Sequence, residues 1–426
     1  MTPCTARLGS ILSAGIVLTS ISSIAHAARV TASPRAIVTY DIGISVPLLQ
    51  LPELAYGISH GVDVAIAQAN STHIVPGVTL HPILLDDTLN GKYSGEKDAT
   101  NARQFITNKL VIGAVGPQNS GADKVSEPVY NAAGLVQISP SNTNPDLTAS
   151  SKRALYEPTT ANTNAPITYF RTCTTDGYQG PAGAIYAREH GFKMVYVTDN
   201  KGTYGIGLAG AFKAEALKIG LNVLGSGELD PNNLATSAQQ LAATIATKKP
   251  GLVYFGGEYG SQGGAELFAD DLRRAGLKNV TFMGGDGILA QAFINGSSAG
   301  GAAGTLATTV GGDPTKDPNA TAFLAAEKAQ FPKTTVQAYD TYAYDATNAI
   351  INAFARAVKN GSIKVGAAMD RTHRLVIARQ VRSTDFQGAS GPVSFNANGD
   401  SLNHTIGVYK VINGKFVFQS VAPKVQ

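Results

Sequence analysis

The sequence has no tryptophan, only two cysteines and few charged residues. Of its 426 residues, 15% are charged and 43% are hydrophobic, a composition typical of a folded globular protein rather than a disordered chain. The 34 basic and 30 acidic residues leave a net charge of +4. They form no basic cluster of the kind that follows a phosphate backbone, which argues against a nucleic-acid partner. A chain of this length can form two or three domains.

Residues 1–27 differ from the rest of the chain. Arg7 is their only charged side chain, residues 11–18 are a short apolar run, and residues 25–27 are Ala-His-Ala. This pattern predicts a secretory signal peptide cleaved after Ala27, because the apolar run is too short to span a bilayer. A buried N-terminal helix is the alternative, and it leaves the flanking pattern unexplained. No other stretch approaches the length of a membrane span.

The two cysteines predict neither a lipid anchor nor a disulfide. Cys4 lies upstream of the apolar run, whereas a lipid-attachment cysteine would stand at the cleavage site. After cleavage Cys173 would remain alone. The exported protein would then have no internal disulfide and would depend on its core for stability.

Short β-rich segments alternate with amphipathic segments from about residue 36 onward. Residues 36–46 and 78–87 predict strands, and between them Leu54, Ile58 and Val62 recur at helical spacing. Strand–helix alternation implies parallel pairing with right-handed crossovers, and nearly continuous apolar strands indicate sheets covered on both faces. The alternation restarts after Arg171. The sequence therefore predicts an α/β protein of two lobes that ends in a hairpin turning at Asn413-Gly414.

Glycines and short polar side chains gather where the predicted strands end. Residues 137–148, QISPSNTNPDLT, show this most clearly, because an apolar run gives way there to hydroxyls and amides. Similar strand ends occur at residues 116–121, 199–204, 256–261 and 284–287. Ligands of open α/β sheets bind beyond the carboxyl ends of the strands. We therefore expect the site there, although residues 137–148 taken alone also fit an ordinary surface loop.

Two enzyme motifs occur outside their usual structural context. GIGLAG at residues 205–210 matches a dinucleotide-binding fingerprint but does not follow the first strand. We therefore expect its glycines to allow the start of a helix to pack closely on the sheet. GISHG at residues 57–61 matches a nucleophile elbow around Ser59. Ser59 falls within a predicted helix rather than on a sharp turn, and we expect it to face solvent. A secreted hydrolase that uses Ser59 remains the alternative from another functional class.

Catalytic carboxylates and metal ligands lack their usual partners in the sequence. Asp86 and Asp87 end a strand without a partner acid, and we expect them to accept backbone N–H groups. Apart from His26, the histidines show no metal-ligand spacing, and Cys173 has no CxxC partner. The sequence predicts no catalytic residue, no metal and no cofactor.

Several segments, in the same order, resemble those of periplasmic leucine/isoleucine/valine-binding proteins, which feed ABC transporters. They are ISPSNTNPDLT, FRTCTTDGYQGPAGAIY, DNKGTYGIGLAGAF, LVYFGGEYGSQ, FMGGDG and YDTYAYDATNA. The resemblance covers nearly all of the chain after residue 27 and implies the type I periplasmic binding fold, with two Rossmann-like lobes joined by a three-crossover hinge. It implies a first lobe of residues 30–165 plus 307–403 and a second lobe of residues 166–306 plus 404–426.

The same resemblance implies a function. The protein would be a periplasmic monomer that captures a small amino acid or amide by hinge closure and delivers it to an ABC permease of the inner membrane. A sensory ligand-binding module is the alternative within this class. The family also holds binders of aromatic acids, short amides and urea.

In the first lobe, the resemblance implies ligand contacts from three segments. Asn119 and Ser120 are the nearest equivalents of a hydroxyl donor to the ligand carboxylate. Ser141 would offer its backbone carbonyl, and Thr143 its hydroxyl and N–H. Tyr56 stands near an aromatic position that covers the ligand.

In the second lobe, the resemblance implies one aromatic and two acidic contacts. Tyr204 would close over the ligand, and Asp286 would receive its ammonium group. Glu258 stands where relatives often carry an aromatic residue. Neutral hydroxyls and N–H groups hold a carboxylate without burying a cation, which agrees with a site for a small zwitterion.

Overall fold

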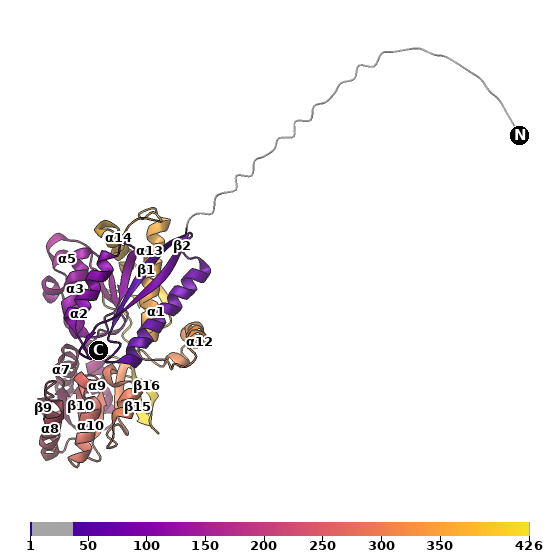
Figure 1. Cartoon of the computed structure of the whole chain (residues 1–426). Helices are drawn as coiled ribbons and strands as arrows, with labels where there is room; N and C mark the ends of the chain where they lie inside the picture. Colours follow the sequence, from indigo (N-terminus) through magenta and orange to yellow (C-terminus); the bar gives the residue numbers. More distant parts are fainter. Residues whose placement is uncertain (2–36, 426) are drawn as a thin grey trace. The chain divides into compact units, whose positions relative to one another are not determined.

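The computed structural model describes Met1 and residues 37–425 (Figure 1). Apart from Met1, the predicted signal peptide of residues 1–27 therefore lies outside the described residues. Among the helices of the described part, none combines the length and the apolar character that a membrane span requires.

Five parallel strands form the first sheet in the order β2-β1-β5-β6-β7. They are β1 (Val38–Val46), β2 (Val78–Asp86), β5 (Val111–Val115), β6 (Gln137–Ser139) and β7 (Tyr169–Arg171). The last seven residues of β1 are all buried, as expected for a strand that is paired on both edges and covered on both faces. The predicted parallel pairing is confirmed.

Helices cover this sheet with two separate apolar cores. They are α1 (Pro52–Thr72), α2 (Gly95–Thr107), α3 (Ser120–Ala133), α13 (Asp340–Lys359) and α14 (Arg371–Arg382). Ile112 of β5 packs in the core that contains α1 and α13, whereas its neighbour Val111 packs in the core with α2 and α3. Figure 1 shows α1 beside β1 and β2. This sheet and its helices are called the first lobe.

Seven strands form the second sheet in the order β16-β15-β12-β11-β10-β8-β9. They are β8 (Met194–Asp199), β9 (Asn222–Glu228), β10 (Leu252–Gly256), β11 (Thr281–Gly284), β12 (Leu306–Val310), β15 (Ile406–Ile412) and β16 (Lys415–Val421). The hairpin β15–β16 turns at Asn413 (φ 52°) and Gly414 (φ 75°), and a type I′ turn requires both φ values to be positive. The predicted terminal hairpin is confirmed.

The helices of the second sheet are α6 (Asp176–Glu189), α7 (Thr203–Lys218), α8 (Leu234–Lys248) and α10 (Ala265–Arg274). This sheet and its helices are called the second lobe. The shorter elements are β3 (Thr88–Leu89), β4 (Lys92–Tyr93), α4 (Arg153–Tyr156), α5 (Pro158–Thr163), α9 (Gly260–Gly263), α11 (Gln291–Gly296), α12 (Thr321–Gln330), β13 (Asp385–Gly388) and β14 (Gly391–Ser394).

The chain passes between the lobes three times, at residues 172–175, 311–339 and 395–405. Two crossings come a few residues later than the predicted lobe limits. β7 belongs to the first sheet although residues 166–306 are expected in the second lobe, and β12 belongs to the second sheet although residues 307–403 are expected in the first. A crossing can begin only after the last hydrogen bond of its strand ladder, and motif matching does not locate that bond.

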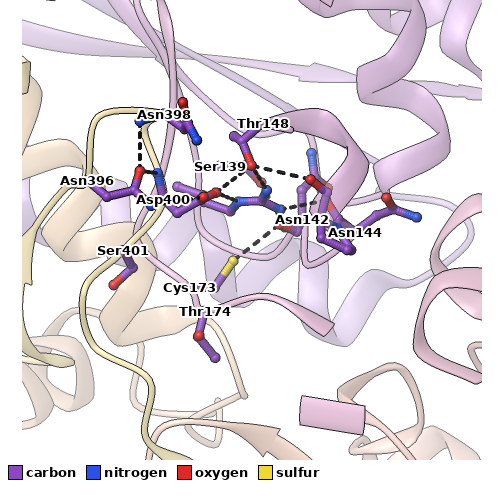
Figure 2. Close-up of polar contacts among 12 residues, drawn as sticks. Ser139, Asn142, Asn144, Thr148, Cys173, Thr174, Asn396, Asn398, Asp400 and Ser401 are labelled. Atoms are coloured by element: carbon purple, nitrogen blue, oxygen red, sulfur yellow. Dashed lines mark hydrogen bonds and ion pairs between the residues drawn. The ribbon is translucent and has the colours of Figure 1, made fainter. Parts of the chain in front are cut away.

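The buried guanidinium of Arg171 binds together the loops that follow β6 and β14. Figure 2 labels its partners in these loops, which are Asn142, Asn144, Thr148 and Asp400. Its Nε donates to Asp400 at 2.8 Å, and its Nη1 donates to the carbonyls of Asn142 and Asn144 at 2.7 and 2.8 Å. Its Nη2 contacts the hydroxyl of Thr148. Burial alone would raise the pKa of Asp400, but the charge of Arg171 holds that pKa below its usual value. Arg171 therefore fixes the polar loop of residues 142–148 against the third crossing.

Replacing Arg171 should strongly destabilise the fold. Arg171→Met would leave the Asp400 carboxylate and two buried carbonyls without their donor, and breaking a buried ion pair typically costs about 3–5 kcal/mol. Urea unfolding followed by circular dichroism measures the change. Arg103→Met, at an exposed position of α2, is the matched control and should have little effect. Equal unfolding midpoints for the two variants would contradict this role of Arg171.

Candidate functional site

The loops that follow β5 and β6 meet at the carboxyl end of the first sheet. Ser141 donates its hydroxyl to the carbonyl of Gln118 at 3.1 Å. Ser120 accepts the N–H of Asn144 at 3.5 Å. Ser120, Ser141 and Thr143 are all at most 5% exposed, and Asn119 caps the start of α3. The structure therefore brings together four of the five residues that the resemblance implies for the first lobe.

Several polar atoms of this region are buried without a hydrogen-bond partner in the described structure. They include the hydroxyl of Thr143, the side-chain oxygen of Asn119 and both carboxylate oxygens of Asp176. Asp176 stands at the start of α6, where its N–H donates to the carbonyl of Thr143 at 2.8 Å. Burial, with the charge of Asp286, raises the pKa of Asp176. Buried polar groups are normally satisfied, so these atoms are available to a ligand.

Asp286 is a buried carboxylate that accepts donors from three different elements. Gln179 of α6 donates to it at 2.6 Å, Tyr204 of α7 donates at 3.0 Å, and Tyr339 contacts its other oxygen. Tyr204 also accepts the N–H of Gly287 at 3.2 Å. Burial raises the pKa of Asp286, and its hydrogen bonds act in the opposite direction. The residue is 2% exposed.

Contacts between the lobes surround these residues. Tyr339 directly precedes α13 of the first lobe, so its contact with Asp286 joins the two lobes. Asn144 of the first lobe donates to the carbonyl of Thr203 in the second at 2.7 Å. The N–H of Ala292 donates to Glu53 of α1 at 3.2 Å. The two strand-end regions therefore face each other directly.

Glu258 follows β10 and lies beside the Asp286 loop. The N–H of Tyr259 donates to the carbonyl of Gly287 at 3.1 Å. The Glu258 carboxylate accepts one hydrogen bond, from the amide of Asn200 at 2.9 Å. Burial, with a smaller contribution from the charge of Asp286, raises the pKa of Glu258 to about 7.

Sequence reasoning missed four residues of this arrangement as site residues: Tyr339, Gln179, Asp176 and Asn200. Each lies inside one of the segments on which the resemblance rests, so the signal was present. Their roles depend on side-chain contacts across elements that are distant in the chain. A match of residue types does not reveal such contacts.

Tyr56 and Ser59 lie on α1, outside this arrangement. Tyr56 is 48% exposed and lines a hollow of about 470 Å³ between the start of α1 and residues 333–337. A cavity of about 1080 Å³ beside the β15–β16 hairpin contains none of the predicted site residues either. The structure does not bring Tyr56 to the other predicted residues.

The expectation that Ser59 faces solvent is wrong, because Ser59 is 5% exposed. The glycines of GISHG serve the packing of another face of α1. A Cβ on Gly57 would lie 2.0 Å from the Asp340 carboxylate, and a Cβ on Gly61 would lie 2.3 Å from the Asp340 carbonyl. The motif therefore lets α1 pack closely on α13, and Ser59 lies within a helix rather than on the sharp turn of a nucleophile elbow.

The glycines of GIGLAG also serve close packing, as expected. A Cβ on Gly205 would lie 2.4 Å from the carbonyl of Gly256 at the end of β10, and a Cβ on Gly207 would lie 2.7 Å from the amide of Asn144. These two positions allow the start of α7 to approach both the second sheet and the first-lobe loop. Tyr204 is thereby placed on Asp286.

Asp86 and Asp87 differ in their environment. Asp86 accepts the N–H groups of Leu48 and Thr88 at 2.9 and 3.1 Å, as expected for an acid that ends a strand. Asp87 is fully buried and has no hydrogen-bond partner for either oxygen, so the expectation is wrong for this residue. Among the described residues, no group of acids, histidines and cysteines is arranged to hold a metal ion.

Asp87 is one of four buried acids in this part of the first lobe. The others are Asp98 on α2 and Asp123 and Glu127 on α3. Burial is the main cause of their raised pKa values, which reach about 6 for Asp98 and about 8 for Asp123. The charge of Asp98 raises the pKa of Asp123 further. Gln137 donates to Asp123 at 2.7 Å and partly opposes the shift.

Comparison with known proteins gives consistent results. Residues 58–414 match the family described as "Receptor family ligand binding region". A Leu/Ile/Val-binding protein of Rhizobium johnstonii is 30% identical over 408 residues, which cover 94% of this chain and 98% of that protein. A leucine-binding protein of Thermotoga maritima has a similar structure, with a TM-score of 0.73, 22% identity and coverage of 90% and 98% of the two chains. A solute-binding protein of R. palustris in complex with 4-hydroxybenzoate aligns with a TM-score of 0.70, 17% identity and coverage of 91% and 96%.

The buried acids predict that the protein loses stability as pH rises. The pKa of Asp123 is about 8 in the folded chain and about 4 in an unfolded chain. Its contribution to stability is therefore complete below about pH 4 and is lost as pH rises through 8. The free energy of unfolding, measured with urea, should be lower at pH 8 than at pH 5. In Asp123→Asn this difference should be smaller by about 1–3 kcal/mol. Asp385→Asn, at an exposed position, should leave the decrease unchanged. An undiminished decrease in Asp123→Asn would show that Asp123 does not titrate in this range.

Proposed function

The chain belongs to the periplasmic leucine/isoleucine/valine-binding protein family, and we propose on this premise that it captures a small branched-chain-like amino acid. Residues 1–27 direct its export. It then binds its ligand between the lobes in the periplasm and delivers it to an ABC permease. The observation that carries the proposal is Asp286, a buried carboxylate whose donors come from both sides of the cleft.

The ligand carboxylate binds at the first lobe in this proposal. Ser120 is the first residue of α3, where free N–H groups and the helix dipole favour an anion. The hydroxyl of Thr143 lies in the adjacent loop and has no partner in the described structure. These groups are neutral donors, so they receive a carboxylate without burying a cation beside it.

The ligand ammonium binds at Asp286. That carboxylate already accepts three hydrogen bonds, and a carboxylate offers about four lone-pair positions. The ammonium completes the set and also neutralises the buried charge. In this proposal the buried carboxylate of Asp176, whose pKa the charge of Asp286 raises, and the carbonyl of Ser141 accept its remaining hydrogens.

Binding requires the lobes to part and close again. The residues of the cleft are at most 5% exposed where the lobes touch, as for Thr143, Glu258 and Asp286. A ligand reaches them only in an open form, and its contacts with both lobes then favour the closed form. The three crossings supply the hinge. Uptake assays with the ABC permease distinguish delivery from a purely sensory role.

The Asp286 anchor is tested by removing its charge. Asp286→Ala should weaken binding of leucine by about 2–5 kcal/mol, roughly thirty-fold to several thousand-fold, because the ligand ammonium loses its buried partner. Isothermal calorimetry measures the change, with Glu189→Ala as an exposed second-lobe control. The melting temperature without ligand should also fall, since three donors lose their acceptor.

The proposal predicts that 4-methylpentanoic acid, which lacks the amine, does not bind the native chain. An Asp286→Ala variant that binds leucine like the native chain would exclude Asp286 as the anchor.

The Tyr339 contact is tested by dissociation rates. Tyr339→Phe removes a hydroxyl that reaches Asp286 from the first-lobe side, and a hydrogen bond to a charged group contributes about 1.5–3 kcal/mol. Surface plasmon resonance should show ligand dissociation roughly ten- to a hundred-fold faster, with association little changed. Tyr204→Phe should act in the same direction. Tyr56→Phe, whose side chain is half exposed, should change neither rate. Slower association with unchanged dissociation in Tyr339→Phe would contradict closure through this contact.

A further inference from the structure

Glu258 is a second buried acid of the cleft, and its place differs from that of Asp286. Asp286 accepts three hydrogen bonds, from Gln179, Tyr204 and Tyr339. Glu258 is 4% exposed and accepts one side-chain hydrogen bond, from Asn200. Its carboxylate therefore retains most of its capacity to accept hydrogen bonds.

Glu258 faces the first lobe near the start of α3. A Cβ on Gly260, two residues after Glu258, would lie 3.7 Å from the carbonyl of Gln50 in the first lobe. Gln50 accepts the N–H of Tyr93 in β4 at 2.6 Å. The charge of Glu258 contributes, after burial, to the raised pKa of Tyr93. A Cβ on Gly121 would lie 3.1 Å from the phenol oxygen of Tyr93, which places this ring beside Ser120 and Asn119. Glu258 thus faces β4 and the start of α3, whereas Asp286 faces Tyr339 beside α13.

The acids of the cleft have no ion-pair partner among the described residues, and only the more distant charge of Arg171 acts on Asp176. In the part of the chain that the structure describes, no lysine, arginine or histidine lies within ion-pair distance of Asp176, Glu258 or Asp286. The guanidinium of Arg171 is paired with Asp400 instead. Glu258 and Asp286 therefore depend on neutral donors, and the nearest donor to the Asp176 carboxylate is the Thr143 hydroxyl, which lowers the pKa of Asp176 without making a full hydrogen bond.

This charge balance distinguishes between ligands. A neutral zwitterion brings one ammonium and one carboxylate, so it adds no net positive charge to a region with three buried acids. Burying an ionised carboxylate without a cation is costly. A ligand with a second cationic group would bring a net charge of +1 and a partner for Glu258.

We propose that Glu258 determines ligand specificity and selects an amino acid whose side chain ends in a cationic amine. The α-ammonium binds Asp286, and the side-chain ammonium binds Glu258 beside Asn200 and Tyr93. This inference rests on the proposed function and changes only the class of side chain.

Lysine and norleucine provide the direct test, because they share a four-carbon side chain and only lysine carries the terminal ammonium. Calorimetry on the native chain at pH 8 should show lysine binding roughly thirty-fold or more tightly than norleucine. This comparison needs no variant, so a folding defect cannot confuse it. Glutamine, whose side chain ends in a neutral amide, is measured as a third ligand to test whether the positive charge is required.

Glu258→Gln should remove the preference. Its affinity for lysine should fall roughly thirty-fold or more while its affinity for norleucine changes little, since only the side-chain ammonium loses its partner. Glu189→Gln removes the same charge at an exposed position of the second lobe and should behave like the native chain.

The pH dependence gives a second measurement. The pKa of Glu258 is about 7, so lysine affinity should rise between pH 6 and pH 8 as the carboxylate ionises. Asp286 and Tyr93 also face Glu258, and Glu258→Gln separates their contribution because it removes only one titrating group. The rise should be absent from the variant and from norleucine binding to the native chain.

The outcomes separate this inference from the proposed function. Norleucine or leucine binding as tightly as lysine, or a Glu258→Gln variant with unchanged preference, would overturn the role of Glu258 and leave amino-acid capture intact. Glutamine binding more tightly than lysine would overturn the cationic class. Binding of none of these amino acids would overturn the proposed function itself.

Discussion

The burial of Asp286 between the lobes is the constraint on which the site depends. A carboxylate that is 2% exposed is stable as an anion only with several donors, and here they come from α6, α7 and the segment before α13. Gln179 and Tyr204 belong to the second lobe with Asp286, whereas Tyr339 comes from the first-lobe side, so the full set of donors forms only where the lobes touch. The contact between Tyr339 and Asp286 therefore links the contact of the lobes to the electrostatics of the cleft.

Arg171 makes a second set of buried contacts, which hold the first-lobe side of the site. Its guanidinium holds two carbonyls of the residue 142–148 loop and the carboxylate of Asp400, in the arrangement of Figure 2. With its backbone held in this way, the loop keeps the Thr143 hydroxyl buried without a partner of its own. Such unpartnered groups are costly in the empty protein, and they are the groups that a ligand can satisfy. The ion pair of Arg171 with Asp400 thus helps to keep these groups in place for a ligand.

Glycine motifs show why short patterns alone were misleading. GISHG and GIGLAG each match an enzyme motif, yet their glycines serve close packing of α1 on α13 and of α7 on the second sheet. Sequence context argued against both enzyme assignments, with a hydrolase that uses Ser59 kept as the alternative, but it placed Ser59 on the solvent side of α1. That error arose because the burial of Ser59 depends on which distant segments pack around α1. Helical periodicity identifies the most apolar face of a helix but not a second face covered by a distant partner.

The sequence by itself determined the α/β class, the parallel order of strands and helices, the terminal hairpin and the strand ends where polar side chains gather. These features depend on local periodicity and turn chemistry, which nearby residues specify. Only the tertiary structure decided that Asp286 is shared by Gln179, Tyr204 and Tyr339, that Tyr56 lies apart from them, and that Glu258 has a single donor. Hydrogen-bond partners and burial depend on which distant segments meet, and the spacing of residues along one chain carries no direct record of those distances.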